Sequence, residues 1–215
     1  LAWDGHFFAD QAIRRPDGSL EVTHNRTETC QYYAFFFGVA SPATHNELWT
    51  RLVQDFGPKR KGTDRWAEIH PSNQLIGNVM RFELLSREGL MRQVYEEALP
   101  YHLRMAELTG TLWENDSPRA SCNHGFASHG GVRLLYRDVL GLRQVSHPRR
   151  EVVIRIPDVP LEWCEGAMPT LEGDIELRWR REGNGARIER LVLPPGWRHR
   201  IEEQAPGALR LLGGP

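Results

Sequence analysis

The sequence of 215 residues predicts a mainly α-helical protein with a β-rich tail. Over most of the chain before residue 146, apolar residues recur every three or four positions, a spacing typical of amphipathic helices. Beyond that point they alternate with polar residues, a pattern typical of antiparallel strands with one exposed face. We therefore expect antiparallel helical hairpins over residues 1–145 and a small antiparallel β-sandwich over residues 146–215.

The first two predicted helices lie between residues 25 and 56. Asn25 or Thr27 can cap a helix that runs to about Ala40. Its Tyr-Tyr-Ala-Phe-Phe-Phe centre is apolar on all sides, so this helix should be buried. The next helix spans Asn46–Phe56 and is followed by Gly-Pro, a common helix stop.

Three further helices are expected before the tail. Ser72 should cap a helix that ends at Gly89. Leu90–Leu108 carries a continuous apolar seam, and Pro100 within it should kink or split the helix. A fifth helix covers about His129–Leu140. Helical pairs whose links alternate between short and long are typical of an α/α toroid, in which the longer loops carry function.

The tail contains three segments that alternate clearly between apolar and polar residues. They are Glu151–Pro157, Asp174–Arg181 and Trp197–Glu202. Glu182–Gly185 reads as a hairpin turn after the second of them. These segments predict a compact antiparallel β domain at the end of the chain.

Composition excludes several classes of function. A net charge of −1 gives no electrostatic footprint for nucleic acid or an anionic membrane. No apolar run approaches the roughly 20 residues of a membrane span, and no signal-peptide layout is visible, so the compartment cannot be read. Cys30, Cys122 and Cys164 fit no zinc pattern and are expected to be structural. Neither a metal nor a cofactor is expected, and the start at Leu1 without methionine suggests a fragment.

The loop between the fourth and fifth helices gathers the residues best suited to chemistry. In Met105–Ser128, Glu114 stands beside Trp113 and is followed by Asn123-His124. A carboxylate, an indole face and an imidazole between two helix ends form the kind of group that a sugar-binding cleft needs. The alternative is that Glu114 is a solvated acid in a loop, and that the imidazole of His124 only makes structural hydrogen bonds near the start of a helix.

Several motifs of the chain resemble one enzyme family. TGTLWEN, SCNHGFASH and LLYRDVLGL look like the last helical hairpin of the α-L-rhamnosidases, the family 78 glycoside hydrolases. NRTETCQYYAFFFGVA (Asn25–Ala40) and EIHPSNQLIGN (Glu68–Asn78) look like the preceding hairpins, in the same order. The resemblance implies that residues 1–145 are the C-terminal portion of an (α/α)6 catalytic toroid. The strands that follow resemble the small sandwich after that toroid.

The resemblance also implies roles for individual residues. The family inverts configuration, so Glu114 would be the general base of the hydrolysis. His124 would contact sugar hydroxyls, Asn123 would orient the loop and Trp113 would offer an apolar platform. Glu28, at the start of its helix, is a further candidate for lining the cleft; it could instead only complement the helix dipole.

The general acid of the family lies in an Arg-Asp-Glu-Arg type motif that this sequence does not contain. We therefore expect the isolated chain to be inactive, with a missing N-terminal half of the same enzyme as its partner and a rhamnose-containing glycoside or polysaccharide as substrate. Another six-hairpin enzyme (a phosphorylase or a lyase) and a non-catalytic carbohydrate-binding remnant are the alternatives. Glu68, Trp66 and Asn73 are weaker candidates, and His102 and His147 are expected at the surface.

Overall fold

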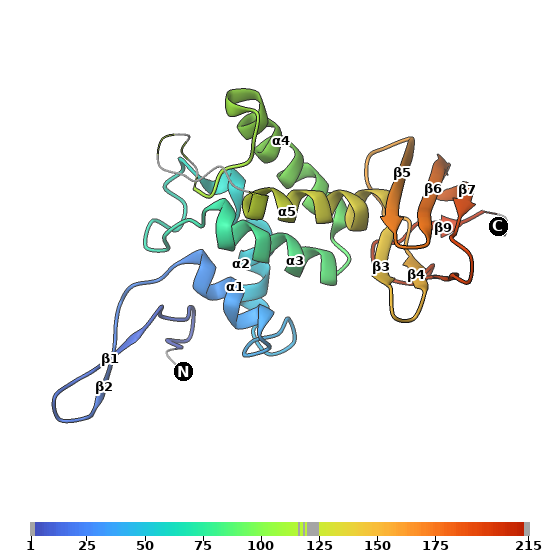
Figure 1. Cartoon of the computed structure of the whole chain (residues 1–215). Helices are drawn as coiled ribbons and strands as arrows, with labels where there is room; N and C mark the ends of the chain where they lie inside the picture. The colour runs from blue at the N-terminus through green and yellow to red at the C-terminus, as the bar shows by residue number, and fades with distance from the viewer. Residues whose placement is uncertain (1–2, 116, 118, 120–124, 213–215) are drawn as a thin grey trace. The chain divides into compact units, whose positions relative to one another are not determined.

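The computed structural model describes residues 3–115, 117, 119 and 125–212, and Figure 1 shows its helices and strands. Contacts divide the chain into two compact units. Unit 1 comprises Leu1–Leu85 and Glu97–Ala127, and unit 2 comprises Ser86–Glu96 and Ser128–Pro215. Helices precede most of the sheet structure, as the sequence predicts. Ser86–Glu96 groups with the C-terminal strands, which differs from the single boundary expected near residue 146.

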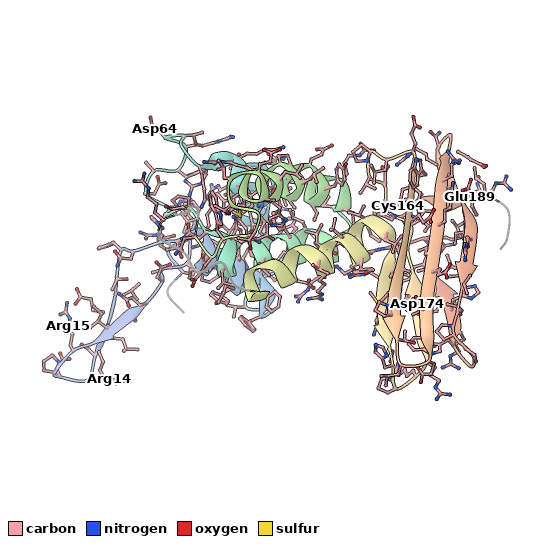
Figure 2. All side chains as sticks on the ribbon, turned by 45° about the horizontal axis from the view of Figure 1, so that its top comes forward. Arg14, Arg15, Asp64, Cys164, Asp174 and Glu189 are labelled. Carbon is pink, nitrogen blue, oxygen red and sulfur yellow. The ribbon has the colours of Figure 1, made fainter. Side chains whose placement is uncertain are left out.

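Unit 1 begins with a hairpin that the sequence analysis missed. β1 (Ala12–Arg14) pairs antiparallel with β2 (Leu20–Val22), and both strands are exposed along their whole length. Figure 2 shows Arg14 and Arg15 on this hairpin. Strands of three residues without a buried face leave no alternating pattern in a sequence.

The first helix, α1 (Glu28–Phe36), starts where the sequence predicts but ends earlier. The Thr27 side chain accepts a hydrogen bond from the Cys30 N–H at 3.0 Å, so Thr27 is the N-cap. The helix ends before Gly38, whose φ of 73° belongs to the left-handed region that glycine tolerates. The prediction of complete burial is wrong for Phe37, just past the end, which is 67% exposed.

The next elements of unit 1 are α2 (Asn46–Gln54), as predicted, and a short 3₁₀ turn, η1 (Pro58–Arg60). A π-helical turn, η2 (Gln74–Asn78), then leads into α3 (Val79–Arg87). Ser72 is therefore not the helix cap that the sequence suggested. Its hydroxyl lies 3.1 Å from side-chain oxygens of both Glu28 and Asn78.

The longest helix is α4 (Met91–Thr109). It is not split at Pro100, which lies inside it. In the described part of the chain, no helix combines the length and apolar character that crossing a membrane requires. Side chains from the N-terminal segment, α1, α2 and the segment that follows α2 form the hydrophobic core of unit 1: Phe7, Phe8, Tyr32, Phe35, Leu48, Leu52, Phe56 and Ile69.

The Glu28 carboxylate is the buried polar centre of unit 1. Its Oε1 accepts a hydrogen bond from Arg60 Nε at 2.5 Å, and the two side chains are 0% and 3% exposed. Its Oε2 accepts from the Tyr32 hydroxyl at 2.8 Å, the Ser72 hydroxyl at 3.1 Å and the Gly57 N–H at 3.3 Å. Donors must replace the water shell of a buried carboxylate, and these groups do so. Glu28 thus joins α1 to the segment between residues 57 and 72.

A second buried ion pair lies beside the first. Arg81 of α3 donates to the two carboxylate oxygens of Glu97 at 2.7 and 2.9 Å and to the backbone carbonyls of Leu52 and Val53. Gly57 has a φ of 101°, and a Cβ there would meet the Arg81 guanidinium. Position 57 therefore needs glycine both for its backbone and for its neighbour.

Unit 2 contains the end of α5 (Gly125–Leu134), the π-helical η3 (Leu135–Leu140) and two sheets. Gly141, with a φ of 101°, ends the helix as predicted. One sheet has the order β3 (Leu142–Ser146), β4 (Glu151–Ile154), β8 (Arg198–Ile201). The other has the order β5 (Trp163–Thr170), β6 (Gly173–Glu182), β7 (Gly185–Val192), β9 (Arg210–Leu211).

The sheets are not purely antiparallel, which corrects the expectation. β8 pairs parallel with β4, and β9 pairs parallel with β7. Neighbouring strands joined by hairpins must be antiparallel, whereas β8 and β9 return to their sheets after long connections and can run parallel. The predicted turn between β6 and β7 is confirmed by their register, in which Glu182 faces Gly185.

One hydrophobic core fills unit 2. Ile175, Leu177 and Trp179 alternate along β6 and are fully buried, and they cluster with Val152 and Ile154 of β4. Charged residues occupy the other positions of β6, and Figure 2 shows Asp174 on β6 and Glu189 on β7, whereas Cys164 on β5 packs against the core. The alternation in the sequence therefore corresponds to a sheet with one buried and one solvent-exposed face.

Replacing Arg60 by Met should destabilise the protein by about 3–5 kcal/mol, because Glu28 would remain buried without its cation. The urea dependence of circular dichroism measures this loss. Arg15→Met is the matched control, because the Arg15–Glu21 pair is 53% and 52% exposed and should contribute about 1 kcal/mol or less. Adding Glu28→Gln to Arg60→Met should recover part of the loss. Equal stability of the two arginine variants would contradict a structural role for the buried pair.

Candidate functional site

The loop that follows α4 begins with a buried tryptophan. Trp113 is 2% exposed, and its indole Nε1 donates to the Thr109 hydroxyl at 2.7 Å. Its backbone N–H points to the Met105 sulfur at 3.5 Å. Trp113 therefore anchors the loop to the last turns of α4, and no sugar platform is formed by its ring in this structure.

Glu114 comes directly after this anchor. Its backbone carbonyl accepts a hydrogen bond from the Leu75 N–H at 3.1 Å, and its side chain is half-buried. Leu75 lies in η2, so the loop is held by α4 on one side and by η2 on the other. A candidate catalytic carboxylate gains from such support, because reacting groups must keep their geometry.

A chain of polar side chains continues from the same loop. The Asn115 Oδ1 atom accepts from Asn73 Nδ2 at 2.8 Å, and Asn73 Oδ1 accepts from Lys61 Nζ at 3.1 Å. Burial lowers the pKa of Lys61 to about 8. Asn73 is only a weak candidate from the sequence, and Lys61 and Asn115 are not candidates there. No local pattern marks them, because the three residues meet only through the fold.

The buried Glu28 network positions this chain. Arg60, which pairs with Glu28, precedes Lys61 in the sequence and donates to the backbone carbonyls of Arg65, Trp66 and Ile69 at 2.6–3.0 Å. Likewise Ser72, which contacts Glu28, precedes Asn73. The observed geometry thus makes Glu28 a buried support, and its expected contact with sugar gains no support from these contacts.

A second polar contact lies between η2 and α4. Gln74 Nε2 lies 2.9 Å from His102 Nε2, an arrangement in which the amide donates to the unprotonated ring nitrogen. Burial lowers the pKa of His102 to about 4. His102 is half-buried, so the expectation that it lies at the surface is met only in part. Its place on an amphipathic helix left the ring's direction undefined in the sequence.

The remaining sequence candidates do not converge on Glu114 in the described structure. His124 and Asn123 lie outside the described residues. Glu68 is exposed, and the indole Nε1 of half-buried Trp66 donates to the Asp55 carboxylate at 3.0 Å. Among the described residues no group of three or more His, Cys, Asp and Glu side chains could hold a metal ion.

Comparisons with known proteins bear on the fold. No family model matches the sequence, and a comparison with curated proteins finds no match. The crystal structure of a GH78 family rhamnosidase of Bacillus sp. GL1 superposes with a TM-score of 0.74 over 99% of this chain. The two sequences are 18% identical, and the chain spans 22% of the length of that enzyme. At this identity the likeness shows a shared fold, in agreement with the family resemblance at that level.

Acid should destabilise the protein through His102. Because the folded-state pKa is lowered from 6.5 to about 4, the unfolded chain binds the proton first as the pH falls. This stability is complete above the unfolded pKa and is lost as the pH falls from 6.5 towards 4. We expect a loss of about 2 kcal/mol near pH 5 relative to about pH 8, measured by urea unfolding.

His102→Gln should remove most of that pH dependence. His24→Gln is the control, because His24 is exposed and should leave the profile unchanged. A wild-type profile in the His102 variant would mean that other groups cause the acid sensitivity.

Proposed function

We propose that this chain is the C-terminal part of the catalytic domain of an inverting glycoside hydrolase, of the kind that releases terminal α-L-rhamnosyl residues. The support of the chain around Glu114 carries the proposal: α4, η2 and the Asn73–Asn115 contact hold the residues at this position, and the Glu114 side chain is half-buried. The fold shared with a GH78 family rhamnosidase supports it. The (α/α)6 toroid of that family is part of the proposal.

In this proposal Glu114 is the general base. Its carboxylate takes a proton from a water molecule as the water attacks the anomeric carbon, and a second carboxyl group protonates the leaving oxygen. We expect the second carboxyl from a part of the enzyme outside this sequence. His124 would bind sugar hydroxyls, since an imidazole can donate and accept at once, and Asn123 would orient its loop.

A phosphorylase is the second candidate, and one observation favours it. Lys61 brings a half-buried ammonium group within two side-chain hydrogen bonds of the Glu114 loop, and a phosphorylase needs a cation near the attacking group. Assays with and without inorganic phosphate separate the two reactions, because phosphorolysis yields a sugar phosphate and hydrolysis yields a free sugar.

Glu114→Gln in the complete protein should abolish release of rhamnose from an aryl rhamnoside while leaving sugar binding largely intact, because the amide cannot accept the proton of the water. Release of the aryl group measures turnover, and calorimetry with rhamnose measures binding. Glu107→Gln is the matched control, because Glu107 is an exposed carboxylate on α4. Near-normal turnover of the Glu114 variant would remove this residue from the role.

Asn73→Ala tests the support of the loop. Without the Asn73 amide the Asn115 side chain loses its partner, so we expect kcat to fall roughly tenfold to a hundredfold through misplacement of Glu114. The Michaelis constant should change little. Asn46→Ala, at an exposed position in α2, is the control. A rise in the Michaelis constant at constant kcat would instead place Asn73 in contact with substrate.

A further inference from the structure

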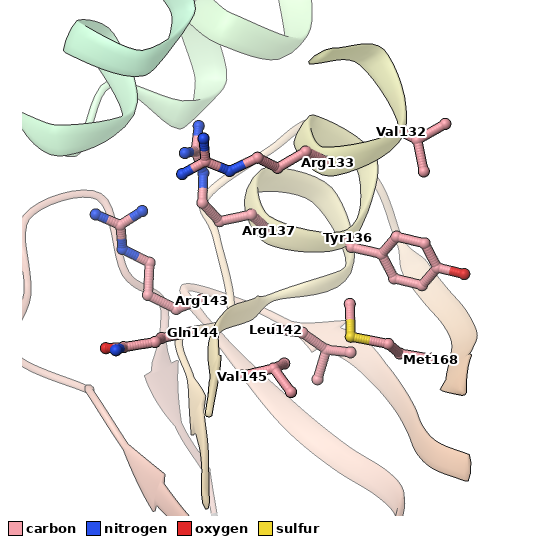
Figure 3. A pocket seen from close by; sticks show the side chains of 9 residues that line it. All are labelled: Val132, Arg133, Tyr136, Arg137, Leu142, Arg143, Gln144, Val145 and Met168. Carbon is pink, nitrogen blue, oxygen red and sulfur yellow. The ribbon is translucent and has the colours of Figure 1, made fainter. Parts of the chain in front are cut away.

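Unit 2 contains a cavity of about 420 Å³ that the proposed reaction does not use. Arg133 and Arg137, near the end of the α5–η3 helix, and Arg143 of β3 contribute to its lining. Figure 3 shows the guanidinium groups of Arg133 and Arg137 next to each other, with Tyr136 and Met168 on the other side of the helix end. A cavity of this volume accommodates a small ligand.

The cationic side of the cavity is built around one buried carboxylate. Arg137 is 7% exposed and donates through Nε and Nη2 to Asp138 Oδ2 at 2.8 and 2.6 Å. The other Asp138 oxygen accepts from the Ser86 hydroxyl at 2.5 Å. Both oxygens of this carboxylate are therefore used by neighbouring side chains.

Two more arginines contact Ser86, the residue whose hydroxyl donates to Asp138, at longer distances. Arg143 Nη1 lies 3.4 Å from the Ser86 hydroxyl, and Arg155 Nη2 lies 3.4 Å from the Ser86 carbonyl. Burial and, next, the charge of Arg143 lower the pKa of Arg155, although Asp138 and Glu202 act in the opposite direction. Like charges held together in a partly buried place favour the binding of an anion.

The other side of the cavity is apolar. The Tyr136 hydroxyl donates to the Ala167 carbonyl at 3.0 Å, which fixes the ring, and the Met168 and Val132 side chains complete this wall. A bare inorganic anion would not use this wall. A ring-shaped carbon body would cover it while its acidic group faced the arginines.

We propose that this cavity binds an organic carboxylate of one-ring size, such as a uronate sugar, with its carboxylate on Arg143 and its ring over the apolar side chains that lie between Arg143 and Met168. The planar fork of an arginine matches the two oxygens of a carboxylate. The inference does not depend on glycoside hydrolysis or on Glu114. These side chains would recognise an acidic ring, whether free or at the end of a glycan.

Titration calorimetry of the protein with glucuronate tests the proposal, with glucose as the uncharged control and inorganic phosphate as the control for a simple anion site. We expect glucuronate to bind, glucose to give no heat, and added salt to weaken glucuronate binding. Arg143→Met should weaken binding roughly tenfold or more, and Arg143→Lys should have a smaller effect. Thermal unfolding establishes that each variant is folded.

Arg187→Met is the matched control, because Arg187 is 54% exposed and pairs with Glu182 on the edge of β7. It should leave glucuronate binding unchanged. No binding of glucuronate, equal binding of glucose, phosphate binding as tight as glucuronate binding, or an Arg143→Met variant that binds like wild type would each overturn the proposal. A glucuronate-terminated disaccharide that binds as well as the free sugar assigns the site to glycan ends.

Discussion

The ion pair between Glu28 and Arg60 is the constraint on which unit 1 depends. Removing two charges from water is costly, and the pair is stable only because further donors surround the carboxylate and three backbone carbonyls receive the guanidinium. The contacts of Glu28 with Gly57, Arg60 and Ser72 join α1 to the irregular segment that follows α2. This segment, which is rich in charged residues, is therefore held by hydrogen bonds in addition to its buried Ile69 side chain.

A short series of hydrogen bonds connects this ion pair to the candidate catalytic loop. Arg60 and Ser72 are bound to Glu28, and their sequence neighbours Lys61 and Asn73 form the polar chain that ends at Asn115. The start of the loop, up to Asn115, is thus held from the core outward by hydrogen bonds. A buried support of this kind lets a surface carboxylate keep its position while remaining open to solvent.

Local signals in the sequence were sufficient for much of the fold, and they failed where distant residues meet. The Thr27 cap and the stop at Gly141 were predictable because each depends on neighbouring residues. Ser72 looked like a cap because the sequence cannot show that its hydroxyl faces Glu28, 44 positions away. Trp113 and His102 were misjudged or left open for the same reason, since burial of a single ring depends on what packs against it.

The two units differ in how their arginines are paired. Among the described residues of unit 1, the buried Arg60 and Arg81 each pair with a carboxylate of their own. In the described part of unit 2, the Asp138 carboxylate is bonded to Arg137 and Ser86, while Arg143 and Arg155 reach only Ser86, at 3.4 Å. Such long contacts compensate poorly for lost hydration. If the arginines served stability alone, apolar side chains at the same positions would stabilise the fold more, because they carry no cost of desolvating a charge. An anion that completes the cluster therefore explains the surplus of cationic groups beside the cavity better.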